Sequence, residues 1–119
     1  MRLGLTETID CAHMLPGHTK CGQLHGHTYK VEVVVEGDAR GGMVLDFADL
    51  RSQVREVLGP YDHRHWNDVL EYPTVENICQ RIATELSRKL AFPFTLRVYE
   101  GQGKWAEMSA SPVPRETSV

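Results

Sequence analysis

The strongest constraint on the fold is the alternation of apolar and polar side chains across residues 28–36. Every second position is tyrosine or valine, and lysine or glutamate occupies most of the positions between them. A period of two is that of a β-strand with one buried face and one face in water. This segment is therefore the clearest strand that the sequence predicts.

Three weaker patterns predict further strands. Residues 3–13 carry most of their apolar side chains at one parity, although a glutamate interrupts them. Residues 94–100 alternate again, and the Gly-Gln-Gly turn at 101–103 can return the chain into a paired strand over 104–109.

Two helices are expected between the second and third strands. Asp46 can cap a helix that ends at Gly59, and a second helix is expected to begin near Thr74. Each has an apolar stripe at the helical period. The order strand, strand, helix, helix, strand, strand predicts an α+β domain in which both helices pack on one face of an antiparallel sheet.

The chain has 119 residues, which predicts one domain over 1–109 and a flexible tail over 110–119. No apolar run is long enough to span a bilayer, and the N-terminus lacks the apolar core of a secretory signal, so we expect no membrane partner and a cytoplasmic location. A net charge of −3 argues against nucleic acid as the main partner. The three cysteines are an odd number, which argues against a disulfide framework. Edge strands favour oligomerisation.

Three histidines lie at strand ends. His25 and His27 share one face at the start of the second strand, and His13 ends the first. Any one of them alone would be read as a half-buried polar residue. All six histidines of the chain, however, fall within residues 13–27 and 63–65. Imidazole suits zinc, copper, iron or nickel, and three neutral nitrogens with an open position are typical of catalytic zinc. The pattern therefore predicts a metal site.

Cys21, four residues before His25, has two interpretations. It could close the site as a fourth ligand, or it could lie beside the metal as a base or nucleophile, with positive charge from Lys20 or His63 favouring its thiolate. The spacing alone does not decide between them. The other cysteines, Cys11 and Cys79, fall on apolar faces and are expected to be small core residues.

Two acidic residues, Asp62 and Glu100, are further candidates for the site. Asp62 precedes His63 and could orient its imidazole for proton transfer, or it could cap the nearby backbone. Glu100 falls on the apolar face of its strand, where a buried carboxylate requires a partner such as a bound base. Alternatively the strand ends there and the carboxylate reaches water.

These residues belong to a longer collinear pattern, which comprises Cys11–His13, Cys21–His27, Leu45–Leu50, Asp62–His63 with Asn67, Pro73–Asn77, Glu100 and Trp105–Glu107. The pattern resembles the 6-pyruvoyltetrahydropterin synthase superfamily. Within it, the likeness is greatest to the 6-carboxytetrahydropterin synthases of the 7-deazapurine pathway, and the three-residue gap between Cys21 and His25 is the more specific clue. The chain departs from the family pattern at Gly101, where threonine is usual, and at Cys11, where alanine or serine is common.

The resemblance implies a tunnelling fold (T-fold), in which several subunits form an oligomeric barrel. The assembly is typically a homohexamer, a dimer of trimers, with active sites between subunits. Pairing of sheet edges between chains would also cover the exposed edge strands.

The resemblance also implies roles for matching positions. The implied zinc ligands are His13, His25 and His27. The implied catalytic residues are Cys21 as proton acceptor, with Asp62 and His63 as a proton relay. The substrate-binding candidates are Glu100 for the pterin ring and Thr74. Lys20 is a candidate for the triphosphate because it is a basic residue near the mouth of the site, with Lys30 and Arg64 as alternatives.

The implied reaction converts 7,8-dihydroneopterin triphosphate to 6-carboxy-5,6,7,8-tetrahydropterin, acetaldehyde and triphosphate, with Zn²⁺ as cofactor. Its product would serve queuosine or archaeosine biosynthesis. An alternative is a 6-pyruvoyltetrahydropterin synthase or another pterin side-chain lyase, such as an aldolase. A third interpretation is a non-catalytic zinc-binding module in which the histidines and Cys21 only stabilise a loop.

Overall fold

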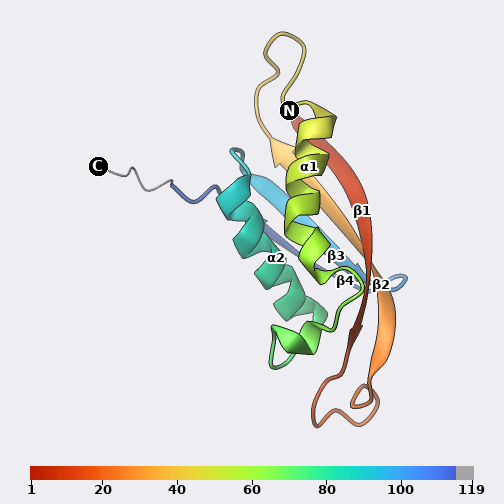
Figure 1. Cartoon of the computed structure of the whole chain (residues 1–119). Helices are drawn as coiled ribbons and strands as arrows, with labels where there is room; N and C mark the ends of the chain where they lie inside the picture. The colour runs from red at the N-terminus through yellow and green to blue at the C-terminus, as the bar shows by residue number, and fades with distance from the viewer. Residues whose placement is uncertain (115–119) are drawn as a thin grey trace.

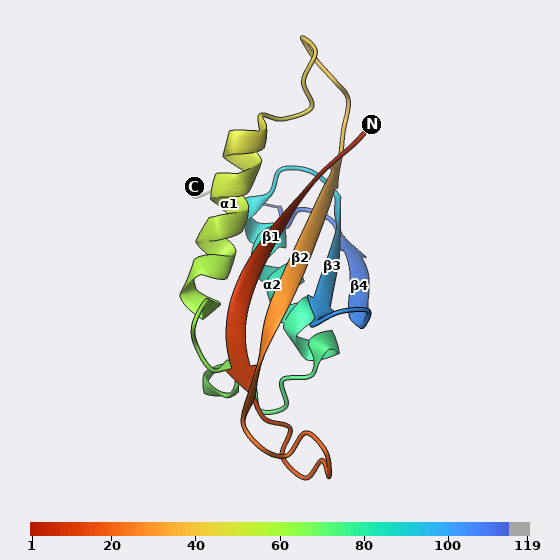
Figure 2. The same ribbon diagram turned by 90° about the vertical axis from the view of Figure 1, so that its right-hand side faces the viewer.

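A computed structural model describes residues 1–114 and contains one four-stranded antiparallel sheet with two helices over one of its faces (Figure 1). The sheet order is β1-β2-β3-β4, so β1 and β4 are its edges (Figure 2). In chain order the strands and α-helices are β1 (Arg2–His13), β2 (His25–Glu36), α1 (Phe47–Leu58), α2 (Val75–Lys89), β3 (Phe94–Glu100) and β4 (Trp105–Ala110). The α+β fold class and the placement of both helices on one face are confirmed.

The core lies between the helices and the face of the sheet that the alternation marks as apolar. In β2, Tyr29, Val31, Val33 and Val35 are completely buried, while Lys30 and the other residues between them remain partly exposed. The helical stripes cover them with residues such as Leu50, Val54, Ile78, Ile82 and Leu86. Burial of apolar surface therefore determines which way each strand faces.

Side-chain caps begin both helices. The carboxylate of Asp46 accepts a hydrogen bond from the backbone N–H of Ala48 at 2.7 Å, and the hydroxyl of Thr74 accepts one from Asn77 at 3.1 Å. These caps satisfy N–H groups that lack a partner in the first helical turn. The expected helix starts are confirmed, and α1 ends at Leu58, where the short 3-10 helix Gly59–Tyr61 follows.

The strand register places the candidate site at one end of the sheet. In the β1–β2 hairpin, His13 lies opposite His25 and Cys11 lies opposite His27. The long loop at residues 14–24 joins these two strand ends (Figure 2). Between β3 and β4 the chain turns through Gly101, whose φ of 65° suits a residue without a side chain. Glu100, the last residue of β3, is thereby placed beside the start of β2.

The C-terminal segment departs from the expected boundary. Ala110, which the sequence analysis assigns to the tail, is the last residue of β4. The backbone N–H of Val113 donates to the carbonyl of Ser87 at 2.8 Å, so the chain follows α2 for a few residues more. The rest of the expected tail, residues 115–119, lies outside the described residues. Among residues 1–114, no helix has the length and apolar character to cross a membrane.

Candidate active site and metal centre

The structure brings the three predicted histidine ligands together. His13, His25 and His27 each contribute one potential ligand atom, and these atoms lie within 4.8 Å of one another. His13 is completely buried at the end of β1, and the other two are half-buried at the start of β2. Each ring packs edge-on against the others, at centroid separations of 4.5 to 5.1 Å. The shared parity of His25 and His27 and the hairpin register produce this cluster.

Hydrogen bonds to backbone carbonyls assign the tautomers of two rings. His13 donates from Nδ1 to the carbonyl of Pro73 at 2.8 Å, and His25 donates from Nδ1 to the carbonyl of Gln23 at 2.7 Å. A neutral imidazole that donates from one nitrogen presents a lone pair on the other. The two Nε2 atoms are 3.0 Å apart, so in the neutral forms of both rings two lone pairs face each other.

The third ring adds another unpaired nitrogen. Nε2 of His27 is buried and makes no hydrogen bond within the described residues. Its separation of 3.4 Å from Oε1 of Glu100 allows charge attraction, but the geometry does not meet that of a hydrogen bond. Burial lowers the pKa of His27, the nearby Glu100 carboxylate opposes this shift, and the other two histidines reinforce it. A neutral ring, which is the form that binds metal, is therefore favoured.

These residues fit a divalent metal ion. Zn–N bonds of about 2.0–2.1 Å at tetrahedral angles would separate the ligand nitrogens by about 3.4 Å, which lies within the 4.8 Å that bounds the cluster. The carbonyls of Pro73 and Gln23 supply the outer hydrogen bonds that usually orient ligating imidazoles. The thiol of Cys21 does not belong to the cluster in the described residues. The donor set is thus three imidazoles without a sulfur.

A pocket of about 320 Å³ opens beside the histidines. Its lining residues are Lys20, Cys21, Gln23, Leu24, His25, His27, Glu100 and Lys104. It therefore joins two of the three histidines to Cys21, Lys20 and Glu100, all of which the sequence analysis singles out. Thr74 is not part of this lining, and its hydroxyl serves as the cap of α2.

Lys104 is a pocket residue that sequence reasoning missed. Its carbonyl accepts a hydrogen bond from the N–H of Glu100 at 2.9 Å, which closes the turn between β3 and β4. This closure places a second ammonium near the pocket in addition to Lys20. The available signal was its position directly after the Gly-Gln-Gly turn that follows Glu100.

Glu100 faces the pocket with only 16 % of its side chain exposed. Its strand partner is Tyr29, a completely buried residue whose hydroxyl has no partner in the described part of the chain. Burial raises the pKa of that tyrosine, and the negative charge of Glu100 raises it further. The carboxylate is thus a largely desolvated hydrogen-bond acceptor at the pocket wall.

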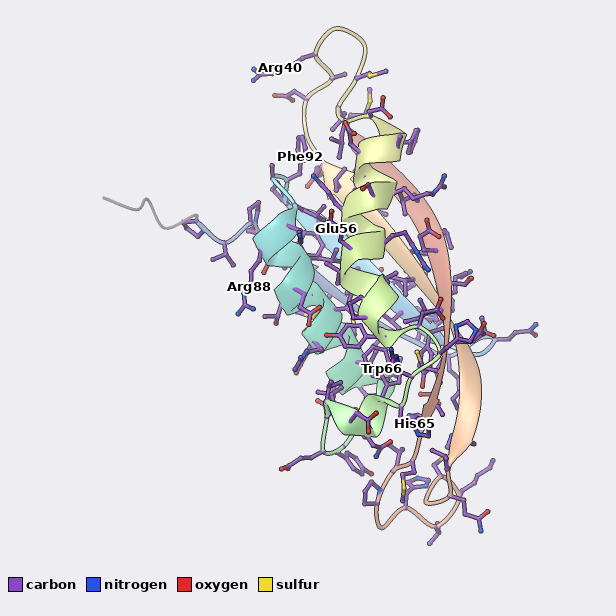
Figure 3. All side chains as sticks on the ribbon, in the orientation of Figure 1. Arg40, Glu56, His65, Trp66, Arg88 and Phe92 are labelled. Atoms are coloured by element: carbon purple, nitrogen blue, oxygen red, sulfur yellow. The ribbon has the colours of Figure 1, made fainter. Side chains whose placement is uncertain are left out.

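Asp62 and His63 lie elsewhere on the chain. They precede His65, which borders the outer edge of β1 (Figure 3). Oδ1 of Asp62 is 3.1 Å from Nδ1 of His63, and it also accepts the backbone N–H of Asp10 at 2.9 Å. The carboxylate therefore contacts both the imidazole and the nearby backbone. That backbone N–H is the main cause of the lowered pKa of Asp62, and His63 and Arg55 lower it further.

A single chain does not place this pair in the pocket of Cys21. His63 lines a separate cavity of about 450 Å³ with Asp10, Thr28 and other residues of the β1–β2 hairpin. His27 lines both cavities, so the two hollows meet at one histidine of the cluster.

The other two cysteines are core residues, as expected. Cys11 and Cys79 are 5 % and 2 % exposed. Burial raises the pKa of Cys11 to about 12 and that of Cys79 to about 11. Both thiols therefore remain protonated and poorly reactive at neutral pH.

Comparison with known proteins agrees with this fold. The profile of the family described as 6-pyruvoyl tetrahydropterin synthase matches residues 2–111. A protein of Archaeoglobus fulgidus, provisionally named 6-carboxy-5,6,7,8-tetrahydropterin synthase, is 46 % identical over 109 residues, which are 91 % of this chain and 95 % of that protein. The dihydroneopterin monophosphate aldolase of Pyrococcus furiosus is 43 % identical over 68 residues, or 57 % of this chain and 60 % of its own length.

A solved structure shows the same fold. The 6-pyruvoyl tetrahydropterin synthase of Caenorhabditis elegans superposes with a TM-score of 0.83 at 21 % identity, and the match covers 93 % of this chain and 96 % of that one. The chain belongs to the 6-pyruvoyl tetrahydropterin synthase family and has its T-fold. It is accordingly a lyase-type pterin enzyme.

Proposed function

We propose that this protein is a zinc-dependent lyase that converts 7,8-dihydroneopterin triphosphate to 6-carboxy-5,6,7,8-tetrahydropterin, acetaldehyde and triphosphate. The observation that carries the proposal is the convergence of three imidazoles beside a pocket that also contains Cys21 and Glu100. The name of the Archaeoglobus relative supports the choice of product, because the alignment covers nearly the whole length of that protein. The proposed context is 7-deazapurine biosynthesis, towards queuosine or archaeosine.

His13, His25 and His27 would hold the zinc ion, because one ring nitrogen of each converges on the same point and Nε2 of His27 is buried without a hydrogen-bond partner among the described residues. When bound there, zinc would supply a Lewis acid that polarises the hydroxyl groups of the substrate side chain. The remaining chemistry belongs to the residues around the pocket.

Cys21 and Glu100 would act on opposite parts of the substrate. The thiolate of Cys21 removes a proton from side-chain carbon, since it shares the pocket without joining the histidine cluster. The carboxylate of Glu100 accepts N–H hydrogen bonds from the pterin ring, which a desolvated acceptor binds strongly. Lys20 contributes positive charge towards the triphosphate. The role of Thr74 in substrate binding stays a prediction.

His63, held by Asp62, would exchange the proton on the other side of the substrate side chain. Because one chain keeps this pair outside the pocket of Cys21, we propose that the complete site forms between two copies. The proposed assembly is the homohexamer of two trimers, in the cytoplasm.

Complementation tests the shared site. Cys21→Ala and His63→Ala variants are each expected to be inactive, and activity should return when they are unfolded and refolded together. Mixed oligomers then contain some sites with both native residues. Oligomers that form without any recovered activity would place both residues of one site in a single chain and contradict the proposal.

The direct test of the reaction is incubation with dihydroneopterin triphosphate, with and without a chelator, followed by identification of the products. Release of acetaldehyde with a 6-carboxypterin, abolished by the chelator and restored by zinc, is expected. The Pyrococcus relative makes an aldolase the second candidate. A different carbon fragment from the same substrate would favour that candidate or the pyruvoyl-forming reaction.

The metal role of Cys21 is tested by zinc content. The Cys21→Ala variant should retain zinc and lose turnover. Loss of zinc together with strong thiolate-to-cobalt charge transfer in the cobalt-substituted native protein would instead indicate a closed four-ligand site and favour the non-catalytic module.

A further inference from the structure

We propose that Arg55 is a positioning residue that fixes the Asp62–His63 pair on the edge of β1. The inference rests on the proposed function, in which His63 exchanges a proton with the substrate. Arg55 lies on α1, outside both cavities described above, and belongs to none of the motifs identified in the sequence.

The pair is attached to the free edge of β1 through the backbone. Asp10 uses both of its main-chain groups, because its N–H donates to Oδ1 of Asp62 at 2.9 Å and its carbonyl accepts the N–H of His63 at 2.7 Å. Two residues further along, the N–H of Ala12 donates to the carbonyl of Arg64 at 3.0 Å. The loop therefore covers the strand edge like an additional short strand.

Arg55 continues this attachment on the other side of Asp10. One guanidinium nitrogen, Nη1, donates to the carbonyl of Thr8 at 3.2 Å, and the other, Nη2, lies 3.4 Å from Oδ2 of Asp62. The two oxygens of the Asp62 carboxylate are thus held separately. Oδ1 contacts the backbone of β1 and the ring of His63, while Oδ2 contacts Arg55. A planar fork with two divergent donors is suited to this bridge.

His63 depends on that support. Its φ of 61° lies in the left-handed region, which is strained for a histidine, and 78 % of its side chain is exposed. Among the described residues, the ring's polar contact is with Asp62. Without a fixed carboxylate, the exposed ring would rotate freely and meet the substrate in the correct orientation less often.

A matched pair of variants tests the inference. Arg55→Gln removes the proposed support, whereas Arg51→Gln removes an arginine one turn earlier on α1 that bonds Glu7 on the same strand at 2.8 Å. Both lose one charge and one contact between α1 and β1. Arg55→Gln is expected to lower kcat about tenfold with KM unchanged, a part of the 10²–10⁴ that acid–base catalysis typically contributes. Arg51→Gln should leave kcat unchanged. The kcat of Arg55→Lys should lie between that of Arg55→Gln and that of the native protein.

A second readout does not depend on turnover. Two-bond ¹H–¹⁵N spectra report the tautomer of each neutral histidine, and a His63→Gln variant assigns the signal. In the native protein and in Arg51→Gln, His63 should carry its proton on Nδ1, towards Asp62. In Arg55→Gln the signal should shift towards a mixture of tautomers, while the signals of His13 and His25 remain unchanged.

An unchanged His63 signal in Arg55→Gln would overturn the inference, as would equal effects of Arg55→Gln and Arg51→Gln. If the native protein shows no lyase turnover, the proposed function fails, but the spectra still decide whether Arg55 orients His63. The two failures are therefore distinguishable.

Discussion

Replacement of His25 by alanine separates a metal ligand from a structural histidine. In the metal-free protein, Nε2 of His25 and Nε2 of His13 are 3.0 Å apart. Two like partial charges of about half an electron repel by about 1 kcal/mol at this separation and an effective dielectric constant of 20. The variant loses this repulsion, but it also loses the hydrogen bond from Nδ1 to the carbonyl of Gln23, which is worth about 1 kcal/mol.

The ring also loses its edge-on packing against His13 and His27, worth about 0.5–1.5 kcal/mol, so the stability of the metal-free protein should fall by no more than about 2 kcal/mol. The native protein should gain about 4 kcal/mol when free zinc is a thousandfold above its dissociation constant. For a chain of this size, that gain corresponds to a rise in Tm of about 15 °C. In His25→Ala most of this rise should disappear.

The assay is thermal unfolding at one protein concentration, with chelator and with buffered zinc. His65→Ala is the control, since this exposed histidine lies outside the cluster and should retain the full zinc-induced rise. A loss of several kcal/mol in the metal-free His25→Ala protein would show that the ring is structural. A full zinc-induced rise in His25→Ala would show that it is not a ligand. Either result refutes the reasoning.

Three further predictions follow from the site. Glu100→Gln should lower kcat/KM about tenfold to a hundredfold with zinc retained, because a charged acceptor is lost, whereas Glu107→Gln on the neighbouring strand should not. If Glu100→Gln instead lost its zinc, Glu100 would belong to the metal centre. The lowered pKa of Asp62 stabilises the fold above the unfolded-state pKa of about 4, and this stability is lost as the pH falls through the lower, folded-state pKa. In urea unfolding, the free energy of unfolding should fall less between pH 5 and pH 2.5 for Asp62→Asn than for the native protein. An equal fall in both proteins would refute the contribution of Asp62. A thiol reagent should modify Cys21 first and the buried Cys11 much more slowly, so rapid modification in Cys21→Ala would contradict the burial.

Much of the fold could be predicted because it follows from local periodicity. The apolar face of β2 and the stripes of both helices are buried as their spacing indicates. Asp46 caps α1 as expected, and α2 begins directly after Thr74, close to its expected start. Ala110 continues the inward-facing parity of Ala106 and Met108 and packs against the core. The tail expected over 110–119 therefore overlaps the last residue of β4.

The candidate site could be predicted only in part. The alternation places His25 and His27 on one face, and the hairpin adds His13, so their convergence follows from short-range structure. The separation of Asp62 and His63 from Cys21 could not be predicted. It depends on how the loop after α1 binds the edge of β1, a contact between segments about fifty residues apart, as in the bond from Asp10 to Asp62.

Residue order and chemistry alone therefore establish the strands, the helices, the shared face of His25 and His27 and the family pattern, because each depends on neighbours a few positions away. The tertiary structure alone decides the ring tautomers and the division of the site. The carbonyl that orients His13 comes from Pro73, 60 residues further along the chain. Such a contact has no local periodicity, since it exists only after the helices pack on the sheet.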